Sequence, residues 1–181
     1  MKVTASPSAG AAEGQAPWSL PGFAIWAPGL PPILTAKLEA RGASMSGYAE
    51  IDLALTNTGQ PVYVSKFFGS TRGIAWSVED RRGRRQRPAE PMPISPPEPP
   101  PPPYLPGQSL AEMGRGMILL ERGATIRVKV QDFAKWIFPG PGNWRVRLHL
   151  RLRNAHPPLA GGRSEPDIEL VSEPMIVRVT A

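Results

Sequence analysis

The chain contains no cysteine and only two histidines, His149 and His156. Without thiols it can form neither a disulfide nor a thiolate metal site. Two histidines without a His-x-His pair and four scattered aspartates do not make the ligand sets that zinc, copper or calcium prefer. We therefore expect no metal and no other cofactor.

Long apolar runs are absent as well. No stretch of about 18 apolar residues occurs, so no membrane-spanning helix is expected. Residues 1–12 lack the continuous apolar centre of a secretory signal. The lack of cysteine fits a cytoplasmic protein, or an exported one that avoids thiols. The compartment stays open, with the cytoplasm as the default and an exported mature form as the alternative.

The chain also lacks a recognisable catalytic set. A nucleophile–base pair needs a histidine that a carboxylate orients. His149 falls on the arginine-bearing side of a predicted strand, where nearby positive charge disfavours a further cation. His156 precedes two prolines in a predicted loop, and isolated carboxylates do not identify a glycosidase pair. The sequence therefore predicts that the protein is not an enzyme.

Proline and arginine, by contrast, are abundant. The chain has 24 prolines, 16 of its 21 basic residues are arginine, and its formal net charge is +6. A basic chain can bind nucleic acid, an anionic surface or an acidic protein. The alternative is a solvated basic surface, which we favour because the basic residues spread over several predicted strands and loops.

The clearest pattern is the strict alternation over residues 143–153. One side carries Trp144, Val146, Leu148, Leu150 and Leu152. The other side carries Arg145, Arg147, His149, Arg151 and Arg153. Alternation of this length indicates a β-strand with one face in a core and the other in water.

The same period recurs from residue 33 onward. The other predicted strands are 33–40, 48–56, 62–64, 74–79, 116–121, 125–130, 167–171 and 175–179. Residues 80–85 predict a hairpin connection in which Gly83 is free to take a positive φ. Residues 131–137 fit one helical turn. The sequence thus predicts an all-β fold, an antiparallel immunoglobulin-like β-sandwich of about seven to nine strands.

Two segments fall outside this pattern. Residues 1–32 predict a disordered tail followed by an apolar Pro/Gly-rich arm, in which proline and glycine forbid a regular element. The arm either packs on the domain, which we favour, or docks into a partner. A single domain then covers 33–181. Within it, residues 88–106 contain 11 of the 24 prolines and predict a long projecting loop.

Turn motifs between residues 33 and 153 resemble a known pattern. They are Thr-Asn-Thr-Gly at 56–59, Asp-Arg-Arg-Gly at 80–83, Leu-Glu-Arg-Gly at 120–123 and Gly-Asn-Trp-Arg-Val at 142–146. Together they resemble immunoglobulin-like bacterial domains of the intracellular proteinase inhibitor type, and β-sandwich pro-segments of deuterolysin-like metallopeptidases. The chain departs from the pattern at the Pro-rich insertion, at Trp144 where tyrosine is usual, and at Arg122 where proline is usual. The resemblance implies a β-sandwich and, as an alternative function, peptidase inhibition or a pro-segment role.

These features favour a non-enzymatic binding or accessory module that acts through protein–protein contacts, with the partner and the oligomeric state open. The arginine face could meet a carboxylate-rich partner, an edge strand could accept a partner strand, and the Pro-rich loop could be recognised. The candidate interaction residues are Arg81, Arg82, Arg84, Arg85, Arg145, Arg147, Arg151, Arg153, Trp18, Trp26 and Tyr104. A third function is binding of anions or nucleic acid through the arginine face. Nucleic acid is less favoured, because few aromatic residues are interleaved with the basic ones.

Overall fold

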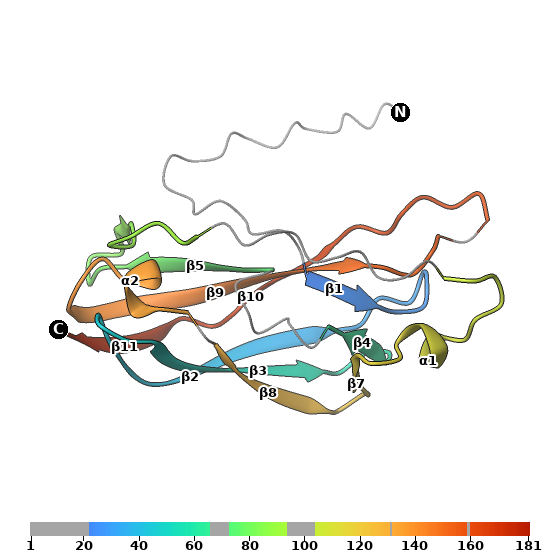
Figure 1. Cartoon of the computed structure of the whole chain (residues 1–181), viewed down its shortest axis with the longest axis horizontal. Coiled ribbons are helices and arrows are strands. Elements are labelled where there is room, and N and C mark those ends of the chain that lie inside the picture. The colour runs from blue at the N-terminus through green and yellow to red at the C-terminus, as the bar shows by residue number, and fades with distance from the viewer. Residues whose placement is uncertain (1–21, 66–72, 94–103, 131, 159) are drawn as a thin grey trace.

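The computed structural model of the chain describes residues 22–65, 73–93, 104–130, 132–158 and 160–181. Within these ranges eleven strands and two one-turn helices form a nearly closed, barrel-like sandwich (Figure 1). The predicted all-β fold is confirmed. Every strand expected from residue 33 onward is present, and a helical turn lies within 131–137.

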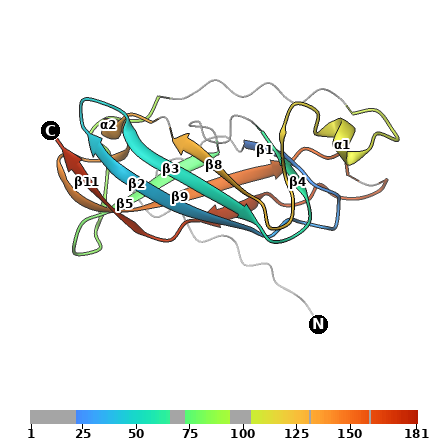
Figure 2. The ribbon, with the colours of Figure 1, turned by 90° about the horizontal axis from the view of Figure 1, so that it is seen from below.

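The strands are β1 (Gly22–Ile25), β2 (Leu34–Ser44), β3 (Ala49–Asn57), β4 (Val62–Val64), β5 (Ile74–Glu79), β6 (Arg85–Gln86), β7 (Ile118–Leu120), β8 (Thr125–Val130), β9 (Gly142–Asn154), β10 (Ile168–Val171) and β11 (Met175–Thr180). The helices are α1 (Leu110–Met113) and α2 (Ala134–Ile137). Both views place α2 and the C-terminus at one end of the sandwich and α1 at the opposite end (Figures 1 and 2).

The sheet follows the order β7-β4-β1-β9-β11-β2-β3-β8, and β5 and β10 branch from β9. Figure 1 shows β5 and β9 in one layer and β2, β3 and β8 in the other. Strand β11 joins the two layers, because it pairs antiparallel with β9 and parallel with β2. Strands β7 and β8 end the path and do not pair with each other in the described residues. The barrel therefore stays open between them.

Strand β9 lies at the centre of its layer and confirms the alternation read from the sequence. Val146, Leu148, Leu150 and Leu152 are fully buried. They pack with Leu53 and other inward residues of β3 in one continuous core. The polar side of β9 faces outward between β5 and β10, so its arginines share a surface with the outward residues of those strands.

The arm that was predicted to be irregular contains a strand. Strand β1 pairs in parallel with the end of β9 and antiparallel with β4, and Ala24 and Ile25 are buried. The prediction was wrong here because the nearest prolines, at positions 21 and 28, flank the four strand residues and remove no hydrogen-bond donor from them. The domain therefore begins at or before Gly22, and residues 1–21 lie outside the described residues.

The Pro-rich segment 88–106 does not project at its start. The Ala89 N–H donates to Phe138 O at 2.9 Å, and the Glu90 carboxylate forms an ion pair of 2.9 Å with Lys135 of α2. Met92 packs against the core. Residues 94–103 lie outside the described residues, so a projecting loop stays a prediction for them alone.

Candidate functional site

Most predicted arginines on the outer face of β9 pair with carboxylates. The pairs are Arg147–Glu79 at 3.0 Å, Arg151–Asp167 at 2.7 Å, Arg151–Glu169 at 3.7 Å and Arg153–Asp167 at 3.8 Å. The carboxylates come from β5, from β10 and from the residue just before β10. This part of the face is therefore largely compensated in charge and is not a bare cationic stripe.

Arg145 differs from the other arginines of β9. The register places it opposite Glu79 of β5 on one side and Ile176 of β11 on the other. Glu79 bonds to Arg147 instead. Arg145 is exposed and forms no ion pair with any described residue. One arginine of the predicted face is thus free to meet a partner.

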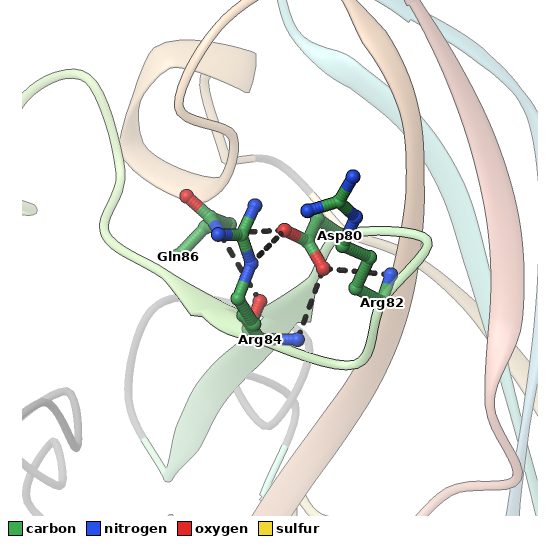
Figure 3. A network of polar contacts seen from close by, with 4 residues as sticks. All are labelled: Asp80, Arg82, Arg84 and Gln86. Carbon is green, nitrogen blue, oxygen red and sulfur yellow. Dashed lines mark hydrogen bonds and ion pairs between the residues drawn. The ribbon is translucent and has the colours of Figure 1, made fainter.

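Asp80 organises the hairpin between β5 and β6. Its Oδ1 accepts hydrogen bonds from the backbone N–H groups of Arg82 (2.8 Å) and Arg84 (3.0 Å), and its Oδ2 accepts one from Nε of Arg84 (2.8 Å) (Figure 3). The backbone hydrogen bond from Arg84 is the main cause that lowers the pKa of Asp80. Gly83 takes the predicted positive φ, 75°. The turn is thus held internally and occupies the Arg84 side chain, whereas those of Arg81 and Arg82 form no ion pair with the described residues.

A hollow of about 400 Å³ lies between this hairpin and the start of β9. Arg81 and Arg82 line it from the hairpin, and Asn143 and Trp144 line it from β9. The Trp144 Nε1–H donates to Gly140 O at 2.8 Å, which fixes the ring. Arg178 of β11 lies opposite Asn143 in the register, so it extends the cationic surface onto the next strand.

A larger groove, of about 930 Å³, crosses the outer face of β11, β2, β3 and β8 at the α2 end. Gly42 contributes no side chain to it and sits at a register shift in β2, with a φ of 150° that residues with a side chain rarely adopt. Three cationic residues line the groove, Arg41, Lys129 and Arg178. Glu50 is the only carboxylate among its lining residues.

Arg178 lines the groove and is the register partner of a residue that lines the hollow, so the two concavities share one cationic surface. We call this surface the basic end. It consists of Arg41, Arg81, Arg82, Arg145 and Arg178. All five side chains are exposed, and none forms an ion pair within the part of the chain that the structure describes.

Sequence reasoning named three of these residues and missed Arg41 and Arg178. Arg178 lies on the outward side of a correctly predicted strand, so the alternation alone could have identified it as a surface cation. Arg41 lies at the register shift in β2, directly after the pair of Ala40 with Ile51. This shift could not be predicted from the sequence. The meeting of these residues at one end depends on strand register.

Trp26 is a core residue, so its assignment as an interaction residue was wrong. Only 1% of its surface is exposed, and its indole N–H donates to the carboxylate of Glu165. The same carboxylate accepts hydrogen bonds from the Gly29 N–H and from Nδ2 of Asn154 (3.0 Å). Because β1 pairs within the sheet, Trp26, which directly follows it, packs into the core. The Glu165 carboxylate and its hydrogen-bond donors, the Gly29 N–H and the Asn154 amide, lie at the indole N–H.

The remaining candidates are Tyr104, Arg85 and Trp18. Tyr104 is half-buried, its enclosed hydroxyl has no hydrogen-bond partner in the part of the chain that the structure describes, and burial raises its pKa. It is therefore poorly placed to meet a partner. Arg85 is exposed on β6, opposite Glu79, and forms no ion pair with the described residues, so it borders the basic end next to the hairpin turn. Trp18 lies outside the described residues.

His149 and Asp132 are the titratable groups that the fold perturbs most clearly by burial. Burial lowers the pKa of His149, and the charges of Arg85 and Arg147 lower it further, against an opposing effect of Glu169. Asp132 is fully buried, and its Oδ2 accepts a hydrogen bond of 3.0 Å from Trp76 Nε1, while its Oδ1 has no hydrogen-bond partner among the described residues. Burial raises the pKa of the Asp132 carboxyl.

The described residues contain no group of three or more His, Cys, Asp or Glu side chains that could hold a metal ion. No helix in the described ranges is long and apolar enough to cross a membrane.

Comparisons of the chain with protein-family models, curated proteins and solved structures found no match. The resemblance to intracellular proteinase inhibitor domains and to peptidase pro-segments therefore stays a prediction.

Proposed function

We propose that the protein is a non-enzymatic binding module that docks an acidic protein surface onto its basic end. The observation that carries this proposal is a division among the arginines. Arg147, Arg151 and Arg153 are paired with carboxylates of the chain itself, whereas Arg145 and Arg178 form no ion pair with any described residue. Unpaired guanidinium groups gathered at one end attract and orient carboxylates of a partner.

The backbone positions of these arginines are fixed by the fold, which favours recognition of a partner's carboxylates. Arg145 and Arg178 project from β9 and β11, which pair with each other along five residue pairs. Arg81 and Arg82 project from a turn that Asp80 holds by hydrogen bonds to backbone. A cation on a fixed backbone loses less conformational freedom when it binds, and a guanidinium group can bind a carboxylate through two parallel hydrogen bonds.

An acidic protein fits this surface better than nucleic acid does. Binding along a nucleic-acid backbone needs a continuous cationic track, with aromatic faces for single strands. The β9 face breaks such a track, because Glu79, Asp167 and Glu169 lie among its arginines. Peptidase inhibition stays an alternative prediction that depends on the Pro-rich loop, most of which lies outside the described residues.

The test compares two double charge reversals with the same change in net charge. Arg145→Glu/Arg178→Glu removes the centre of the basic end. Arg115→Glu/Arg122→Glu is the matched control, because both residues are exposed and lie near α1, β7 and β8 at the opposite end. Polyglutamate is the probe, and titration calorimetry or fluorescence anisotropy reports its affinity.

We expect the basic-end variant to lose about tenfold in affinity, close to 1.4 kcal/mol, and the control to stay within about twofold of the unchanged protein. Equal losses in both variants would show that only net charge matters and would refute a localised site. Tighter binding of duplex DNA than of polyglutamate at the same salt concentration would favour nucleic acid instead.

A further inference from the structure

Strand β8 has a free edge. It ends the sheet path, and no described strand pairs with it on the side away from β3. Its six residues pair with β3 without a register shift. The other short border strands, β6, β7 and β10, have two, three and four residues. Among these border strands β8 therefore offers the longest free edge.

The pairing with β3 determines which backbone groups point to this edge. The Asn57 N–H donates to Ala124 O (3.0 Å) just before β8, and the Ala49 N–H donates to Asp132 O (2.9 Å) just after it. Hydrogen-bonded positions alternate along an antiparallel pair, so Ile126, Val128 and Val130 bond to β3 between these two points. Thr125, Arg127 and Lys129 consequently direct their N–H and C=O groups to the free edge.

The side chains of β8 also suit an added strand. Ile126 and Val128 face the core but are only half-buried, whereas their neighbours in β3, Leu55 and Leu53, are fully buried. The exposure of Ile126 and Val128 follows from the opening in the barrel, where no strand of the described residues covers them. An added strand with apolar residues on its inner side would bury this surface.

The charges on the outer face of β8 favour an acidic added strand over a basic one. Arg127 and Lys129 are exposed and form no ion pair with any residue that the structure describes. Pairing of β8 with β8 of a second copy would bring these cations close together, which is a recognised protection of edge strands against self-association. Carboxylates opposite Arg127 and Lys129 would instead be attracted.

We propose that the β8 edge binds an extended acidic segment of another protein as an added strand. Its carboxylates lie opposite Arg127 and Lys129, and its alternate apolar side chains lie beside Ile126 and Val128. This second binding surface borders the basic end, because Lys129 lines the same groove as Arg41 and Arg178. It differs from the basic end in its use of backbone hydrogen bonds and in the extended conformation of its ligand.

The test uses a capped peptide in which glutamate alternates with valine, added to the isotopically labelled full chain. We expect the amide signals of Thr125, Arg127 and Lys129 to shift and to gain protection from hydrogen exchange. Those of Ile126 and Val128, which already bond to β3, are expected to gain much less. The matching lysine–valine peptide is expected to produce neither effect.

Two variants of Arg127 distinguish the contribution of its backbone N–H to peptide affinity from the contribution of its side-chain charge. Arg127→Pro removes an N–H that points to the free edge and leaves the pairing with β3 intact. Arg127→Thr removes the same charge and keeps that N–H. We expect Arg127→Pro to lose about tenfold or more in peptide affinity and Arg127→Thr to lose about threefold, with both retaining cooperative thermal unfolding.

Equal affinity of Arg127→Pro and Arg127→Thr would overturn strand addition, as would shifts confined to residues outside β8 or an equal response to the lysine–valine peptide. The basic-end variant Arg145→Glu/Arg178→Glu is expected to keep the β8 amide response. The failure of one proposal is therefore distinguishable from the failure of the other.

Discussion

Glu79 accepts a hydrogen bond of 3.0 Å from Nη1 of Arg147, although the residue directly opposite Glu79 in the register is Arg145. Long side chains in an antiparallel pair can also reach a diagonal neighbour. The Glu79 carboxylate can therefore reach either Arg145 or Arg147, and it bonds to Arg147. Because Asp167 pairs with Arg151 and Arg153, Arg145 at the start of β9 is left as the arginine of this strand without an ion pair among the described residues.

A double-mutant cycle can measure this preference of Glu79 for Arg147. Glu79→Gln and Arg147→Gln are expected to show a coupling of about 0.5–1 kcal/mol in the free energy of unfolding, as is typical of partly exposed ion pairs. The matched cycle, Glu79→Gln with Arg145→Gln, is expected to show a smaller coupling. Denaturant unfolding measures both. A larger coupling to Arg145 than to Arg147 would contradict the observed pairing.

Asn57 is expected to be a strongly stabilising residue. It is fully buried, its Nδ2 donates to Gln60 O (2.7 Å) and Leu120 O (2.9 Å), and its Oδ1 accepts from the Gly59 N–H (2.9 Å). Asn57→Ala would leave these groups without partners and is expected to cost about 2–4 kcal/mol in the free energy of unfolding.

The control for this prediction is the adjacent exposed residue. Thr58→Ala removes one long hydroxyl contact of 3.4 Å to Ile33 O and is expected to cost less than about 0.5 kcal/mol. Denaturant unfolding compares the two variants. Similar costs for both would mean that the buried amide contributes little to stability.

Trp76→Phe tests the buried contact with Asp132. The substitution keeps most of the ring and removes the one hydrogen-bond donor that this carboxyl group has among the described residues. We expect a loss of about 1–3 kcal/mol, because a buried polar group is left without a partner. Trp144→Phe is the control, since its Nε1–H bonds to Gly140 O in a partly exposed site. A larger loss for Trp144→Phe would contradict this account.

Asp132 should also impose a pH dependence on stability. Its pKa in the folded protein is raised by burial above the ordinary value of 3.8. Its contribution to stability is therefore fully present below that value and is lost as the pH rises through the folded pKa, because the charged form is disfavoured in the folded state.

Asp132→Asn does not titrate, so it isolates this effect. The free energy of unfolding of the unchanged protein minus that of Asp132→Asn is expected to fall as the pH rises from about 4 toward neutrality. Denaturant unfolding at several pH values measures this difference. A difference that stays constant, or that grows with pH, would refute the assignment.

Most strands could be predicted from the sequence, because the alternation of apolar and polar residues that indicates a strand is a local pattern. The alternation of Val146 with Arg147 and of Leu148 with His149 correctly placed one face of β9 in the core. The hairpin at Gly83 followed from residue type alone. The short strand β1 was missed, since four residues beside proline carry no usable period and gain their structure from pairing with β4 and β9.

The candidate surfaces were predicted only in part, because they depend on contacts between distant segments. Whether Arg147 or Arg145 is free depends on where Glu79 of β5 lies. Whether Arg178 joins the hairpin arginines depends on its register with Asn143. The free edge of β8 depends on the whole strand order, which the spacing of strands along the chain does not determine.

The most direct test of the basic end observes the arginine side chains themselves. In an NMR titration with polyglutamate, we expect the Nε–Hε signals of Arg145 and Arg178 to shift first, and those of Arg147 and Arg151 to respond weakly because carboxylates of the chain already hold them. Shifts of equal size at Arg147 and Arg151, or at Arg115 and Arg122 at the opposite end, would contradict a binding surface built from unpaired arginines.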